Sequence, residues 1–96
     1  MGEEELDDYE STLELALVQE YKAVVGMFNY AVETDRRFYL ANDVAVEVRS
    51  GGSPTLLEVV LHDAWVWDMY RPARFVANVK VVTFKDVNIE ELAKDA

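Results

Sequence analysis

The side chains most able to do chemistry lie between positions 63 and 76. Asp63 and Asp68 are two carboxylates in one short stretch, the kind of pair that glycosidases use as acid and base. Arg71 and Arg74 follow closely, and a nearby guanidinium favours the ionised form of a carboxyl group. Because a general acid must hold a proton, this neighbourhood predicts recognition rather than acid–base catalysis.

The same stretch is rich in residue types that anchor protein interfaces. Tryptophan, tyrosine and arginine dominate binding energy at many of them. The alternative is a structural corner, held by Arg–Asp pairs and by arginine stacked on aromatic rings, each worth about 0.5–1 kcal/mol when exposed. Such local pairs are common, so both interpretations stay open. The candidate partner-binding residues, including two arginines earlier in the chain, are Arg36, Arg37, Trp65, Trp67, Asp68, Tyr70, Arg71 and Arg74.

Residues for other catalytic chemistry are scarce. His62 is the only histidine, cysteine is absent, and serine occurs only at positions 11, 50 and 53. A nucleophile–base triad needs a converging set that this supply does not provide, and a zinc site needs three or four histidine or cysteine ligands. We therefore predict no catalytic residues, no metal, no cofactor and no enzyme activity. His62 is predicted to be a surface or hydrogen-bonded histidine.

The charge is unevenly distributed along the chain. Of the net −10, residues 1–34 carry −8, residues 35–85 carry +1 and residues 86–96 carry −3. Nucleic-acid binding depends on a cationic surface, so the total argues against a non-specific mode, although a local basic patch remains open. An acidic helix, in contrast, suits a basic protein partner.

Several signals bear on location. The absence of cysteine fits a reducing cytosol. No apolar run approaches the ~20 residues that a membrane span needs. The first residues are acidic, whereas a secretory signal begins with basic residues and an apolar run. We therefore expect a cytoplasmic protein that does not enter the membrane.

Hydrophobic periodicity predicts one helix and four strands. The helix covers residues 3–25 and ends at Gly26. The predicted strands, which show alternating patterns, cover residues 27–34, 37–49, 55–67 and 75–87.

Two connections are also predicted. Residues 50–54 form a hairpin loop, because a phosphate-cradling loop would be followed by a helix and usually contain lysine. Pro72 forces residues 68–74 into a corner. In the third strand, uninterrupted alternation places Trp65 and Trp67 on the side of Leu61, opposite His62.

This order of elements predicts an α+β fold. A long N-terminal helix packs on a four-stranded antiparallel meander, with a cystatin-like topology. The chain is predicted to form a single domain over residues 1–96. Its acidic N-terminal end covers residues 1–5. A polar C-terminal tail, either a short helix or disordered, covers residues 89–96.

Three segments carry a resemblance to a known family: ETDRRFYLAN at 33–42, DAWVWDMYRPARFV at 63–76 and VVTFKDVN at 81–88. They resemble the actinobacterial "domain of unknown function 2469" family, over roughly Leu6 to Leu92. That family has no assigned activity, and its genes often lie near those for signal peptidase and ribonuclease HII. The resemblance implies an actinobacterial cytosolic protein connected with nucleic-acid or secretion-related processes.

Three functional hypotheses follow. The first is a non-catalytic binding or adaptor module for a protein partner, acting through the aromatic–arginine corner at 63–76. The alternative is an RNA- or DNA-binding accessory protein that uses the same arginines, with aromatic rings as stacking surfaces. A second alternative is a small-ligand pocket between helix and sheet. Phosphate binding weakens steeply with salt, which separates the first two.

Overall fold

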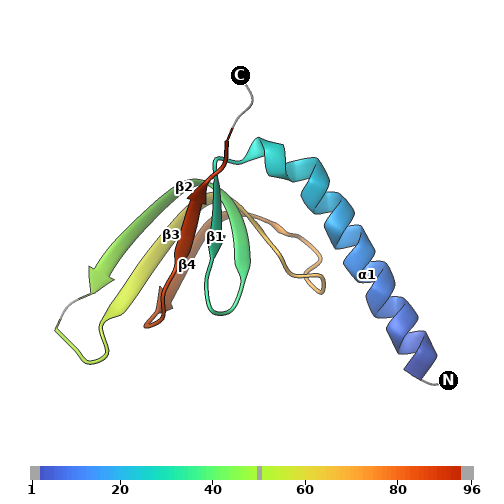
Figure 1. Ribbon diagram of the computed structural model, residues 1–96, viewed down its shortest axis with the longest axis horizontal. Helices are drawn as coiled ribbons and strands as arrows, with labels where there is room; N and C mark the ends of the chain where they lie inside the picture. Colours follow the sequence, from blue (N-terminus) through green and yellow to red (C-terminus); the bar gives the residue numbers. More distant parts are fainter. Residues whose placement is uncertain (1–2, 50, 94–96) are drawn as a thin grey trace.

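The computed structural model describes residues 3–49 and 51–93. It contains one long helix, a single 3-10 turn and five strands (Figure 1). These elements are α1 (Glu3–Val24), η1 (Val25–Met27), β1 (Tyr30–Glu33), β2 (Phe38–Arg49), β3 (Leu56–Val66), β4 (Phe75–Thr83) and β5 (Asn88–Glu91).

The α+β class is confirmed, as are the helix and the four strands that periodicity predicted. The predicted strand count of four is wrong, because Asn88–Glu91 forms a fifth strand in the segment expected to be a polar tail. With Ile89 as its only apolar residue, β5 has no pattern of its own. It forms because β1 supplies hydrogen-bond partners, and the Leu92 N–H donates to the Asn29 carbonyl at 2.8 Å. Residues 1–2 of the predicted acidic end and 94–96 of the tail lie outside the described residues.

The five strands form one antiparallel sheet in the order β4-β3-β2-β1-β5. Only residues 84–87 connect β4 to β5, although these strands are at opposite edges of the sheet. The sheet must therefore curl so that its two edges approach each other. Thr83 Oγ1 donates a 3.1 Å hydrogen bond to Asp35 Oδ1, which joins the end of β4 to the β1–β2 loop across this curl.

A sharp bend crosses the three long strands at one level. Asp63 has a left-handed φ of 51° in the middle of β3, and it pairs with neither neighbouring strand although the register continues on both sides. At that level the alternation of inward and outward side chains slips by one residue. Elsewhere, successive inward-facing side chains on a strand are two residues apart. At this level each long strand has one interval of three residues instead: Ala41 to Val44, Leu61 to Ala64 and Val76 to Val79.

This slip corrects the predicted faces of β3. Leu61 belongs to the core inside the curl, whereas Trp65 and Trp67 pack in a second cluster on the outer face, against α1. The prediction assumed an uninterrupted period of two, and one left-handed residue is enough to reverse it.

The helix covers only part of the sheet. Leu17 and Val24, in its C-terminal half, are buried against Leu40 and Trp65, but Tyr9 and Leu15 are exposed. Figure 1 shows the N-terminal half of α1 extending beside and beyond the sheet. A cystatin-like topology is therefore not confirmed, since the helix contacts the sheet at one end instead of lying across it.

Candidate functional site

A single carboxylate joins α1 to the corner between β3 and β4. Glu20 Oε1 accepts a 2.6 Å hydrogen bond from Trp65 Nε1–H and a 2.8 Å bond from Arg74 Nε–H. Arg74 Nη2 also pairs with Glu20 Oε2, so the ion pair is bidentate. Arg74 lowers the pKa of Glu20 below its ordinary value, burial opposes this, and the Trp65 bond lowers it further. The same contact raises the pKa of Arg74.

Aromatic rings fill the space around this contact. The Tyr21 ring lies 5.9 Å from Trp65 and 5.2 Å from Trp67, between ring centroids. The Trp67 ring in turn meets Phe38 edge-on at 6.2 Å. Edge-to-face packing of this kind is favourable beyond the area it buries, so it helps to hold α1 against the sheet.

The corner itself, residues 67–74, is fixed by local hydrogen bonds. The Tyr70 N–H donates to Asp68 Oδ1 at 3.1 Å, and the Arg71 N–H donates to the Asp68 carbonyl at 3.2 Å. Arg71 Nε donates to the Ala73 carbonyl at 2.9 Å. Arg74 Nη1 donates to the Arg71 carbonyl at 3.0 Å. Aspartate commonly supports a turn in this way, so the corner is an ordered platform.

An open groove runs between α1 and this platform, with a volume of about 410 Å³. Tyr70 Oη–H donates to Glu10 Oε1 at 3.2 Å across it, and Arg37 Nη2 lies 3.8 Å from Asp68 Oδ2. Tyr70 remains 62% exposed. We call this feature the helix–corner groove. Its lining residues are Glu14, Leu17, Arg37, Trp67, Asp68, Met69 and Tyr70.

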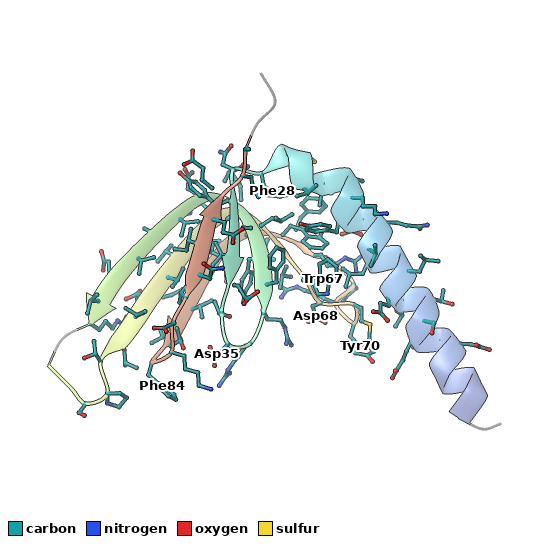
Figure 2. All side chains as sticks on the ribbon, in the orientation of Figure 1. Phe28, Asp35, Trp67, Asp68, Tyr70 and Phe84 are labelled. Atoms are coloured by element: carbon teal, nitrogen blue, oxygen red, sulfur yellow. The ribbon has the colours of Figure 1, made fainter. Side chains whose placement is uncertain are left out.

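Half of the predicted partner-binding residues meet at this groove: Arg37, Trp67, Asp68 and Tyr70. Figure 2 shows Trp67, Asp68 and Tyr70 on the side of the sheet nearest α1, away from Phe84. The other half are placed elsewhere, and their placement requires three corrections.

Trp65 is 0% exposed and cannot touch a partner directly. The Arg74 side chain is 18% exposed and is held by Glu20, so the Arg–Asp pairing expected for it is wrong. Arg36 is exposed but lines a different hollow, beside Lys80, so it does not extend the corner. Arg71 is exposed on the corner and lies outside the groove lining.

Sequence reasoning missed the contributions of Glu10, Glu14 and Glu20 from the helix. A signal for Glu20 was available, because it is a carboxylate on the apolar stripe that includes Leu17 and Val24. A polar group at such a position must find a partner when buried. No comparable local pattern identifies Glu10 as a neighbour of Tyr70.

Two further cations of the sheet, Arg49 and Lys80, are also paired with a carboxylate. Glu58, on the outer face of β3, accepts from Lys80 Nζ at 2.9 Å and from Arg49 Nε at 2.7 Å, and these bonds lower its pKa. His62 Nδ1 lies 2.6 Å from Asn78 Oδ1, as expected for an exposed, hydrogen-bonded histidine. Across residues 3–49 and 51–93, no three histidine, cysteine or carboxylate side chains gather as a metal site would need. No helix in those ranges has an apolar run that could cross a bilayer.

These features define a small α+β protein whose curled antiparallel sheet meets an acidic helix at an aromatic groove. The whole chain, residues 1–96, matches the family described as "Protein of unknown function (DUF2469)", and it belongs to that family. The resemblance seen in the sequence is thereby confirmed.

Uncharacterised proteins of Mycobacterium bovis and Mycobacterium tuberculosis are similar to the chain. They are 60% identical over 94 residues, which covers 98% of this chain and 93% of theirs. No solved structure matches it.

Proposed function

We propose that the protein is a non-catalytic binding module that holds a segment of another protein in the helix–corner groove. The observation that carries this proposal is the exposure of Tyr70 beside Trp67 and Met69, at a place where the helix passes beyond the sheet. Tyrosine, tryptophan and methionine are enriched at interfaces. Because the corner is already ordered in the free protein, it loses little conformational entropy when a partner binds.

The charges around the groove suggest the chemistry of the partner. Glu10 and Glu14 stand on the helix side and Asp68 on the corner, against the single cation Arg37. A segment that brings one apolar side chain and one or two basic residues would complement this lining. A chain without cysteine suits the reducing cytoplasm, where we place this interaction.

Nucleic-acid binding has less support from the geometry. Arg37, Arg49, Arg74 and Lys80, four of the seven basic residues between positions 35 and 85, already contact carboxylates. An already neutralised guanidinium releases fewer counterions when it meets a phosphate. The small-ligand alternative has less support too, because aromatic rings fill the space between α1 and the sheet.

The test is affinity capture from native lysate with matched variants. Tyr70→Ala and Arg37→Ala alter the groove. Phe84→Ala and Arg36→Ala are the controls, since Phe84 is equally exposed at 63% and Arg36 is the neighbouring arginine. We expect the two groove variants to lose a partner that wild type and both controls retain, with or without nuclease.

Loss of that partner in the controls as well, or retention by the groove variants, would contradict the proposal. Partners that disappear on nuclease treatment would favour the nucleic-acid alternative instead. Arg74→Ala is unsuitable as a groove variant, because it would disrupt the contact that holds the helix.

A further inference from the structure

The two outer strands of the sheet leave pairing groups unused. In the described part of the chain, β4 and β5 each have one hydrogen-bonded neighbour, β3 and β1 respectively. Proteins usually protect such edges with prolines, bulges or free lysines. The nine residues of β4 include no proline, and the single lysine, Lys80, is held by Glu58 at 2.9 Å. β4 is therefore a poorly protected edge.

The unpaired part of β2 is a useful contrast. β1 pairs with β2 only over Phe38–Ala41, so residues 43–49 also have an open side. That stretch carries Asp43, Glu47 and Arg49, three charges in seven residues. Charged side chains of this kind discourage strand addition unless the added strand brings the opposite charge, as Glu90 of β5 does for Lys80 of β4.

Large apolar side chains are exposed along both outer strands. They are Phe75 and Val82 on β4 and Ile89 on β5. These side chains form no single patch, because Phe75 and Val82 face outward on β4 whereas Ile89 faces the inner core from β5. Ile89 is the one that an added strand would place beside inner-face residues of β4.

The faces and charges of β4 and β5 complement each other. Ile89 is directly opposite Val32, which lies in the core inside the curl, and Glu90 is opposite Ala31 on the outer face. On β4, Val81 packs against the inner core, and the neighbouring Lys80 lies on the outer face with Glu58. A slip of one residue would exchange all these faces, so the pattern restricts the possible registers.

We propose that the protein self-associates by adding β5 of one copy, antiparallel, to the β4 edge of the next, with Ile89 opposite Val81 and Glu90 opposite Lys80. Ile89 then continues the inner apolar row, and Glu90 meets the lysine. Each copy offers one β4 and one β5, so the contact is head-to-tail and repeats from one copy to the next. The net charge of −10 opposes this assembly. Residues 35–85, which include β4, do not share that negative charge, because their own net charge is +1.

Sedimentation velocity on the full chain tests self-association. We expect a species that is a multiple of the 11.0 kDa chain, and we expect Ile89→Asp to convert it to monomer. Leu15→Asp, at an exposed leucine on α1, is the matched control and should leave the assembly intact. Circular dichroism confirms that each variant is folded. A wild-type chain that is monomeric at all concentrations would overturn the proposal.

Disulfide trapping tests the register. Because the chain has no native cysteine, only the introduced cysteines can form a disulfide. In the proposed pairing Val82 is opposite Asn88 of the next copy. Val82→Cys and Asn88→Cys proteins, prepared separately and then mixed and oxidised, should form a disulfide-linked dimer on a non-reducing gel. Leu15→Cys mixed with Asn88→Cys should not. An oligomer that yields no Val82–Asn88 crosslink would show that other surfaces hold the copies together.

Discussion

Glu20 and Arg74 are 54 positions apart in the chain and form a bidentate ion pair between α1 and the β3–β4 corner. Trp65 donates to the same carboxylate. Together with the packing of Leu17 and Tyr21, this contact positions the helix beside the corner and so helps to form the helix–corner groove. Glu20 therefore contributes both to the stability of the fold and to the shape of the candidate site.

Replacing Glu20 with alanine should destabilise the protein by about 1–3 kcal/mol, since it leaves a mostly buried guanidinium and an indole N–H without their acceptor. Glu14→Ala, at an exposed position on the same helix that lines the open groove, should stay within about 0.5 kcal/mol of wild type. Urea unfolding measures both. A double-mutant cycle with Arg74→Ala should show coupling, and equal effects of the two glutamate substitutions would contradict this role.

Acid should weaken the fold through the same group. The pKa of Glu20 is lower in the folded protein than its ordinary value, so its stabilisation is complete above the ordinary value and is lost as pH falls through the folded value. Urea unfolding from about pH 7 to pH 3 should show stability decreasing below about pH 5. Glu20→Gln should flatten that decrease. If Glu20→Gln loses stability with the same pH dependence as wild type, other carboxylates cause the loss, and Glu58 is the next candidate.

The bend at Asp63 predicts an unusual response to substitution. Its left-handed φ of 51° is accessible to glycine and strained for β-branched residues. Asp63→Gly should be neutral or stabilising, and Asp63→Val should cost about 1–3 kcal/mol. Asp43→Val is the control, because valine suits an ordinary strand position. If Asp63→Val is as stable as Asp43→Val in thermal unfolding, the bend does not depend on this residue.

The two tryptophans should differ in fluorescence. Trp65 is fully buried and Trp67 borders the groove, so Trp67→Phe leaves a protein whose remaining emission is blue-shifted and poorly quenched by iodide. Trp65→Phe should leave a more quenchable emission and lose the bond to Glu20. The opposite order of quenching would contradict the burial of Trp65 under α1 and the position of Trp67 at the groove.

Local patterns predicted the parts of the fold that depend on local physics. The extent of α1 follows from helical spacing, and β2 and β3 follow from alternation ended by glycine and proline. β5 was missed because Asn88–Glu91 becomes a strand only through pairing with β1. The reversal of faces at Asp63 was missed because an exposed aspartate gives no sign of its φ.

The candidate site was predicted in part. The Trp67, Asp68 and Tyr70 side of the corner could be identified because interface-forming residue types are concentrated there. The opposite wall, from Glu10 to Leu17, could not be assigned, since nothing in a sequence shows which helix face meets which loop. For the same reason Arg74 was expected to pair within its own segment.

Hydrogen–deuterium exchange on the captured complex tests the central claim most directly. If the helix–corner groove holds the partner, the backbone amides of residues 67–73 and those of α1 from Tyr9 to Leu17 should exchange more slowly in the complex than in the free protein. The facing ends of β2 and β3, at residues 46–49 and 56–59, should be unchanged. Slower exchange confined to those strand ends, or no difference in the corner, would contradict the account.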